Sequence, residues 1–302
     1  MKIATIIVTF YPTEDIVKLV LLLQRDTHVI LVDNSEESVE AINKIKRDFE
    51  KNVMVIENKK NIGLAAAQNL GVQLGLEEKY DFFLFLDDDS MVDDNYVLDL
   101  RASFENYKIS HLAEKIGIFA SNFYDVNLKR ETNFGVLDGK SYQTKTFWQS
   151  DEEYLKVSFV VSSGTFIPAE TFLKVGLFRA AFFIDHIDTD YCLRVLKAGL
   201  SIIVTRRPYL SHTVGRRREY KILGMSFKPT FNSARRKYYV ARNGIQLVQE
   251  YGAEFPGFVK IFYKKFIHDL VGILFFEDQK WAKLRATFRG IRDGRRTDGG
   301  NE

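Results

Sequence analysis

The sequence has one cysteine among 302 residues and no long apolar run. A single cysteine excludes a disulfide framework and a zinc site built from cysteines, and it fits a reducing compartment such as the cytosol. We expect Cys192 to be a buried thiol and not a nucleophile. No stretch reaches the roughly 18 apolar residues that span a bilayer, and the first ten residues lack a signal-peptide pattern. The expectation is a protein that is soluble or attached to a surface.

The distribution of charge is uneven. The net charge is only +3, but residues 1–205 contain 22 Lys and Arg against 31 Asp and Glu, whereas residues 206–302 contain 21 against 9. The basic part has no recognised nucleic-acid-binding motif, so no nucleic-acid partner is expected. A diphosphate group and an anionic membrane surface fit this charge better.

Strand and helix patterns alternate along the first hundred residues. Apolar runs predict strands at Ile3–Thr9, Val29–Val32, Val53–Glu57 and Phe82–Leu86, and helical periodicity predicts helices at Thr13–Arg25, Ser38–Phe49 and Ala65–Leu76. This alternation predicts a mostly parallel sheet covered by helices. Polar residues follow each strand, and ligands of open α/β sheets bind at the carboxyl ends of the strands.

The pattern changes after residue 115. Further strands are predicted at Ile116–Ser121, Lys156–Val161 and Ser201–Thr205, with helices at Glu170–Val175 and Tyr191–Ala198. From about Pro229 onward the sequence is helical and basic.

Three consecutive aspartates, Asp87, Asp88 and Asp89, follow the apolar run that ends at Leu86. Such carboxylates repel one another unless a cation lies among them. Their oxygens suit Mg²⁺ or Mn²⁺, often shared with substrate phosphates. A solvated acidic loop is the alternative.

Several short segments strengthen the first interpretation because they occur together in one order: Thr9–Tyr11, Val32–Ser35, Asn61–Ala65 with Asn69, Asp87–Asp89, Ser163-Gly164, Phe183–Asp190, His212–Gly215 and Tyr239–Asn243. Over roughly residues 1–245 the chain resembles inverting glycosyltransferases of family 2. Within that family it is most similar to the rhamnosyltransferases that use dTDP-rhamnose, through Phe183–Asp190 and the later pattern Gly290–Gly294.

The resemblance implies the GT-A fold, an α/β architecture in which a Rossmann-like nucleotide-binding half and an acceptor-binding half share one mostly parallel mixed sheet. We expect a catalytic domain at 1–228, divided into halves at 1–115 and 116–228. A C-terminal basic helical region follows at 229–302.

For the donor, the resemblance implies contacts from Thr9, Tyr11, Asp33, Asn61, Gly63, Asp87, Asp88, Arg216 and Arg217. Asp33 could accept the N3–H of thymine or uracil. The alternative is that it only forms a turn with the Asn and Ser that follow it. Guanidinium groups pair bidentately with phosphate, but Arg216 to Arg218 could equally be solvated surface.

For the metal, the resemblance implies Mn²⁺ or Mg²⁺ as cofactor, with Asp87, Asp89 and His212 as the expected metal-binding residues. Asp89 would bind the ion directly, and Asp87 would bind the ribose or the water shell of the ion. A structural role for His212 is the alternative.

For catalysis, the resemblance aligns Asp188 with the general base, which deprotonates the acceptor hydroxyl during an in-line displacement. Ile187 stands where many members of the family have Glu. Asp190 is expected to pair with Arg194 on one helix face. Acceptor contacts are implied for Ser163, Gly164, Asp185 and Arg242.

These features predict a metal-dependent enzyme that transfers L-rhamnose from dTDP-β-L-rhamnose to a bacterial cell-surface polysaccharide such as an O-antigen, on a glycan or lipid-linked acceptor. A UDP-hexose or UDP-N-acetylhexosamine donor is the alternative within the family. A sugar-1-phosphate nucleotidyltransferase would need a Gly-rich basic loop after the first strand, which Thr9–Pro12 is not. A non-catalytic nucleotide-binding module is the other alternative.

The C-terminal segment 256–296 combines helically spaced Phe residues with ten Lys or Arg against four Asp or Glu. This composition is typical of the membrane interface, so we expect peripheral contact with an anionic membrane at the cytoplasmic face. Packing on the catalytic domain, or on a second subunit in a homodimer, is the alternative.

Overall fold

The structure is a computed structural model that describes residues 1–49, 51–125, 130–148, 150–212, 220–222, 225–227 and 229–296. The chain divides into two compact units. The first comprises Met1–Val136, Thr144–Phe183 and Ile187–Thr213, and the second Leu137–Gln143, Ile184–His186 and Val214–Glu302. The expected domain boundaries at residues 115 and 228 stay predictions.

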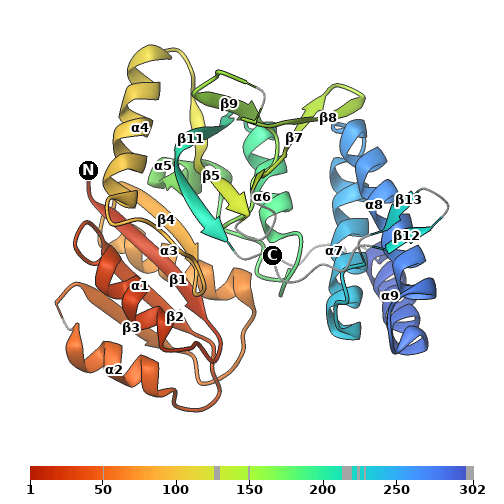
Figure 1. The fold of residues 1–302 in the computed structure, drawn as a ribbon, viewed down its shortest axis with the longest axis horizontal. Helices are drawn as coiled ribbons and strands as arrows, with labels where there is room; N and C mark the ends of the chain where they lie inside the picture. The colour runs from red at the N-terminus through yellow and green to blue at the C-terminus, as the bar shows by residue number, and fades with distance from the viewer. Residues whose placement is uncertain are drawn as a thin grey trace. The chain divides into compact units, whose positions relative to one another are not determined.

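The first unit is built on one large mixed sheet (Figure 1). Its strands lie in the order β3 (Val53–Glu57), β2 (His28–Asp33), β1 (Ile3–Thr9), β4 (Phe82–Asp87), β10 (Thr165–Pro168), β5 (Ile116–Asp125), β11 (Ser201–His212) and β9 (Tyr154–Val157), and β6 (Arg130–Glu131) pairs with β5. β1 to β4 are mutually parallel, as are β5 and β11, whereas β9 and β10 run antiparallel to their neighbours. The predicted mostly parallel sheet is confirmed.

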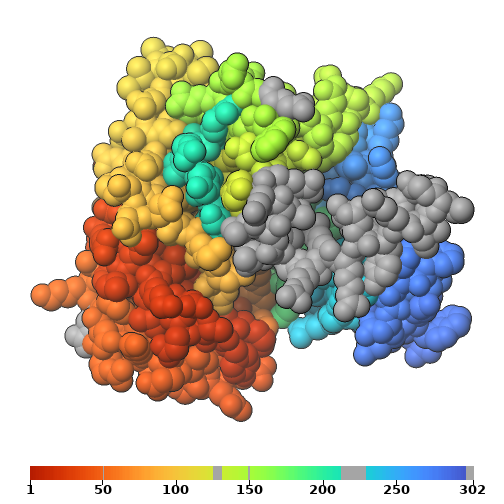
Figure 2. All heavy atoms as spheres, viewed as in Figure 1, coloured from red at the N-terminus to blue at the C-terminus, as the bar shows by residue number. Residues whose placement is uncertain are grey.

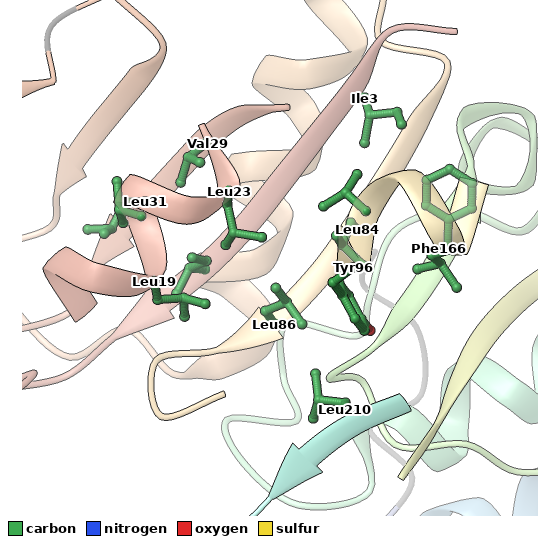
Figure 3. Close-up of a cluster of buried hydrophobic side chains, with 14 of the residues drawn as sticks. Ile3, Leu19, Leu23, Val29, Leu31, Leu84, Leu86, Tyr96, Phe166 and Leu210 are labelled. Atoms are coloured by element: carbon green, nitrogen blue, oxygen red, sulfur yellow. The ribbon is translucent and has the colours of Figure 1, made fainter. Parts of the chain in front are cut away.

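Helices cover both faces of this sheet because successive strand residues point to opposite sides. On one face, α1 (Asp15–Leu23), α2 (Glu40–Asp48) and α4 (Tyr96–Ser110) pack on a core that includes Val29, Leu31, Leu84 and Leu86 (Figure 3). On the other face lie α3 (Leu64–Glu77), α5 (Ala169–Val175) and α6 (Ile187–Lys197). There Gly71 of α3 lies against Ile6, and the Phe83 ring contacts Phe172 of α5. Strands buried on both faces read as continuous apolar runs.

Several elements differ from the sequence-based expectation. The strand predicted at Lys156–Val161 is β9, which ends at Val157, because the Ser158 and Phe159 N–H groups both donate to Gly135 O and turn the chain out of the sheet. β11 continues to His212, seven residues beyond the predicted end. Helix α4 and strand β10 were not predicted. β10 has only four residues, so its position between β4 and β5 depends on pairing with both.

The second unit is mainly helical, with α7 (Ala234–Tyr251), α8 (Pro256–Phe275), α9 (Lys280–Arg295) and a hairpin of β12 (Tyr220–Ile222) and β13 (Met225–Phe227). The hairpin of β7 (Phe134–Asp138) and β8 (Ser141–Lys145) contributes its tip. A Cβ at Gly290 would collide with the α7 backbone at Tyr238, and one at Gly294 with Arg242. The Gly290–Gly294 pattern therefore allows close helix packing.

Two buried lysines join the three helices. Lys237 of α7 and Lys283 of α9 both bind Glu277, at 3.0 and 2.9 Å, and all three side chains are almost fully buried. Lys237 also pairs with Asp269 of α8 at 2.6 Å, and Lys283 with Asp278 at 2.9 Å. Burial by itself would raise the pKa of Glu277, but the two lysines hold it below its ordinary value.

Glu114 gives the first unit an acid-sensitive contact. Burial alone would raise its pKa, but hydrogen bonds from Lys156, Ser201 and Tyr107 outweigh burial and lower the pKa to about 2. Because the pKa is depressed in the folded state, the stabilisation is complete above the unfolded value near 4.5 and is lost as the pH falls toward 2. We expect Glu114→Gln to reduce the free energy of unfolding at neutral pH by about 1 kcal/mol, because its partner Lys156 is exposed and water screens the pair. Urea unfolding at several pH values would test this; a difference from wild type that persists at pH 2 would contradict it.

Candidate active site

A buried aspartate lies where β1 and β2 end. The register of these parallel strands sets Thr9 beside Asp33. Oδ1 of Asp33 accepts hydrogen bonds from the Thr9 hydroxyl (2.8 Å), the Ser35 hydroxyl (2.7 Å) and the Ser35 N–H (3.2 Å), and the Tyr11 N–H donates to the Ser35 hydroxyl (2.8 Å). These bonds fix the orientation of the carboxylate. Within the described ranges, none of its hydrogen bonds uses Oδ2.

Hydrogen bonds from neighbouring side chains fix the loop before α3. Asn61 accepts the Gly63 N–H through its side chain at 3.0 Å, and Asn34 donates to Gly63 O at 3.3 Å. Gly63 has φ +90°, and a Cβ there would lie 2.7 Å from the Phe183 ring. Glycine is thus required by Phe183 as well as by the backbone conformation.

The three aspartates begin at the same edge of the sheet, since Asp87 is the register partner of Val8 on β1. The side chains of Asp87 and Asp89 are exposed, and that of Asp88 is half-buried. Burial and the charges of Asp89 and Asp33 raise the pKa of Asp88, and a hydrogen bond from the Phe10 N–H opposes them. The middle carboxylate therefore accepts a hydrogen bond from the residue that follows β1, which spacing alone could not decide.

Ser163 and Gly164 support the turn that carries these aspartates. The Ser163 hydroxyl accepts the Asp87 N–H at 3.1 Å and lies 3.1 Å from the Ser90 hydroxyl. Gly164 donates its N–H to Phe85 O at 2.7 Å and has φ +78°. The described contacts of Ser163 are thus with the aspartate turn, and its acceptor role remains a prediction.

The end of β11 runs beside the same turn. Met91 and Ser211 exchange both backbone hydrogen bonds, at 3.3 and 3.0 Å. This bridge brings the backbone before His212 next to the segment that follows Asp89. The His212 side chain and the whole of Arg216, Arg217 and Arg218 lie outside the described residues. In the described part of the chain, no three His, Cys, Asp or Glu side chains are grouped as metal ligands.

Asp188 and Asp190 differ sharply although both lie in the first turn of α6. Asp188 is half-buried, and its Oδ1 accepts the Thr189 N–H at 2.7 Å. Asp190 is fully buried and pairs with Arg194 at 2.9 Å, as predicted, and also with Arg179 at 3.1 Å. Asp190 therefore holds α6 through two buried ion pairs, whereas the Asp188 carboxylate is partly exposed.

Cys192 lies one helical turn after Asp188. Its thiol points toward Val160 O at 3.8 Å, and burial raises its pKa to about 12. A thiol that stays protonated in a packed site is a poor nucleophile. The expectation of a buried structural thiol is confirmed.

Asp185 forms a clasp with α7. Arg236 donates to both carboxylate oxygens, at 3.2 and 2.6 Å, and Asn243 Nδ2 donates to Ile184 O and Asp185 O at 3.0 and 2.8 Å. Asp185 and His186 both have positive φ, 66° and 64°, which is costly for residues other than glycine. The clasp holds this strained segment, which leads directly into α6 and Asp188.

The sequence analysis did not identify Arg236 as the partner of Asp185. The spacing of seven residues between Arg236 and Asn243 places both on one face of α7, and this was the available signal. Arg242, predicted to bind the acceptor, has its guanidinium 4.9 Å from the Tyr239 ring and its Nε 2.9 Å from Asn243 Oδ1.

We expect Asn243→Ala to lower turnover by roughly tenfold or more while nucleotide affinity changes little, because the strained segment before Asp188 loses two hydrogen bonds. Steady-state kinetics and nucleotide titration would separate these effects. Gln249→Ala, at an exposed position of the same helix, is the matched control. Equal losses in both variants would contradict a positioning role.

An α/β sheet with polar side chains at the carboxyl ends of its parallel strands is typical of nucleotide-binding proteins. Residues 5–170, more than half of the chain, match the family described as glycosyl transferase family 2. The chain belongs to this family and is a glycosyltransferase.

Individual relatives agree with this assignment. The dTDP-rhamnosyl transferase RfbF of Shigella flexneri is 27% identical over 229 residues, which cover 76% of this chain and 73% of RfbF. Residues 1–349 of S. aureus TarS align with a TM-score of 0.57 at 12% identity, over 96% of this chain and 81% of the TarS fragment. The same fragment in complex with UDP-GlcNAc gives 0.50 at 15%, over 97% and 72%.

A longer TarS structure aligns with a TM-score of 0.52 at 14% identity over 82% of this chain, and the chain spans only 40% of that longer protein. At such identities the likeness shows the fold. The predicted GT-A fold, with a mostly parallel sheet and C-terminal helices, is confirmed.

Proposed function

We propose that the protein is a metal-dependent inverting rhamnosyltransferase. It transfers L-rhamnose from dTDP-β-L-rhamnose to a glycan or lipid-linked acceptor of a bacterial cell-surface polysaccharide, at the cytoplasmic face of the membrane. The observation that carries this proposal is the similarity to the Shigella dTDP-rhamnosyl transferase, which extends over three quarters of the chain.

Asp33 supports a pyrimidine nucleotide as donor. Because Thr9 and Ser35 occupy Oδ1, Oδ2 would be the oxygen that accepts the N3–H of the base. The exposed ring of Tyr11, beside the end of β1, would contact the same nucleotide. Asn61 and Gly63 would contribute through the loop that their hydrogen bond shapes.

The aspartate turn fits a divalent cation. Three neighbouring carboxylates have excess negative charge, and the charges of Asp89 and Asp33 add to burial in raising the pKa of Asp88. Asp87, Asp89 and His212 would hold Mn²⁺ or Mg²⁺. When bound, the ion would neutralise charge on the departing diphosphate. Arg216 and Arg217 are proposed to bind the same diphosphate.

Asp188 would act as the general base. Its carboxylate would take the proton from the acceptor hydroxyl as the oxygen attacks the anomeric carbon, and the nucleoside diphosphate would leave from the opposite face. A single displacement of this kind inverts the configuration. Arg236 and Asn243 would keep the residues before Asp188 in place, whereas Ser163, Gly164, Asp185 and Arg242 would border the acceptor.

A UDP-hexose or UDP-N-acetylhexosamine donor is the second candidate. Uracil and thymine present the same N3–H to Asp33, so this contact favours neither. The fold is shared with S. aureus TarS, which has been solved with UDP-GlcNAc.

A panel of nucleotide sugars, each with Mn²⁺, with Mg²⁺ or with excess chelator, would test the proposal through binding and slow donor hydrolysis. We expect dTDP-rhamnose to be hydrolysed in the presence of metal and more slowly in chelator. Turnover of UDP-sugars alone would support the second candidate. Full activity in excess chelator would contradict the proposed metal dependence. Binding with no turnover of any donor, even with acceptor extracts, would favour a non-catalytic module.

A further inference from the structure

Helix α8 has an outward-facing stripe of aromatic, aliphatic and basic side chains. Its exposed residues lie one or two helical turns apart on one face: Lys260, Tyr263, Lys264, Ile267, Leu274 and Phe275. Phe275 is 69% exposed and Ile267 59%. Large apolar side chains at such exposure, repeated along one face, mark a surface that contacts something else.

Helix α9 has a similar stripe, made of Trp281, Arg285, Phe288, Arg292 and Arg295. Trp281 is 83% exposed and Phe288 62%. We call the two stripes together the α8–α9 outer face. Part of the surface of these helices is visible as blue spheres in Figure 2.

The opposite sides of both helices are occupied by α7. Phe262 of α8 packs against Gly244 of α7, and Gly290 and Gly294 of α9 lie against the α7 backbone. The outer face is therefore not the side that packs within the second unit.

The acidic residues of this region form ion pairs within the unit. Asp269 and Glu277 pair with the buried Lys237 and Lys283, the exposed Asp278 also pairs with Lys283, and Asp293 pairs with its neighbour Arg292. By contrast, within the described ranges no ion pair involves Lys260, Lys264, Arg285 or Arg295. The tertiary structure thus turns a mixed-charge sequence into a surface that is cationic and aromatic.

We infer that the α8–α9 outer face binds the surface of an anionic lipid bilayer. Trp281, Phe288 and Phe275 would enter the boundary between headgroups and acyl chains, and the lysines and arginines would lie near lipid phosphates. No helix within the described ranges is long and apolar enough to cross a bilayer, so the contact would be interfacial. The inference rests on the proposed function, because it places the enzyme on the membrane that carries a lipid-linked acceptor.

Charge favours a bilayer over a second copy of the chain. A symmetric dimer would set the same face of two molecules together and bring unpaired lysines and arginines into contact. Such like charges repel one another when they are removed from water. An anionic bilayer instead supplies the compensating charge.

Co-sedimentation of the full chain with vesicles tests the inference. We expect binding to phosphatidylcholine vesicles that contain phosphatidylglycerol, weaker binding to phosphatidylcholine alone, and loss of binding at high salt. The double variant Trp281→Ser/Phe288→Ser should weaken binding by roughly tenfold or more, and Arg285→Ser/Arg295→Ser should remove the preference for the anionic lipid. Leu112→Ser and Leu173→Ser, at exposed apolar positions of the first unit, are the matched controls.

The inference would be overturned if the wild type ignores phosphatidylglycerol vesicles, or if outer-face and control variants bind equally well. It would also be overturned if the outer-face substitutions convert a dimer to a monomer in light scattering without changing vesicle binding. Unfolding curves of each variant would establish that it is folded. Donor hydrolysis measured without vesicles is expected to be unchanged in the outer-face variants. Vesicle binding with no turnover of any donor would contradict the proposed function, but it would leave the membrane-binding role of the α8–α9 outer face supported.

Discussion

Asp188→Asn is expected to reduce turnover by about 10²–10⁴-fold while leaving nucleotide binding and stability nearly unchanged. The amide cannot take a proton from the acceptor hydroxyl, and positioned general bases contribute rate factors of about this size. We expect the structural loss to be small because Asp188 is only half-buried and accepts hydrogen bonds from the N–H and hydroxyl of the adjacent Thr189. Steady-state kinetics, nucleotide titration and thermal unfolding of the same preparation would measure the three quantities.

Asp99→Asn is the matched control, because it makes the same substitution at an exposed aspartate of α4. It should affect turnover much less than Asp188→Asn. Turnover of Asp188→Asn within about twofold of wild type would place the base elsewhere or support a non-catalytic module.

Asp190→Asn is expected to have the opposite result, a loss of about 3–5 kcal/mol in the free energy of unfolding. This carboxylate is fully buried between Arg179 and Arg194, and its removal leaves two guanidinium groups without their counter-charge. Denaturant unfolding monitored by circular dichroism would measure the difference.

Asp188→Asn serves as the stability control for this experiment, since it changes the same residue type two positions away on the same helix. If the two variants unfold at the same denaturant concentration, the buried ion pairs contribute little. A stable Asp190→Asn protein that is nevertheless inactive would instead indicate that Asp190 takes part in the reaction.

Much of the first unit could be predicted because continuous apolar runs locate both the buried strand β1 and the more exposed edge strand β3. The bounds predicted for β1 and β3 match the structure to the residue, and α1 is two residues shorter at each end than its prediction. The short β10 has no such pattern, because its place in the sheet comes from pairing with β4 and β5. Helix α4 also went unpredicted, since Leu98 and Ile109 on its exposed side and Ser103 on its buried side weaken the helical periodicity.

For the site, the sequence by itself determined which side chains follow the strands, and parallel strands necessarily bring Thr9, Asp33 and Asp87 to one edge. Only the tertiary structure decided that the Phe10 N–H donates to Asp88, that Asp185 pairs with Arg236, and that Asp269 and Glu277 pair with the buried Lys237. Local patterns record periodicity and burial, whereas ion pairs between residues 32 to 51 positions apart depend on how helices pack.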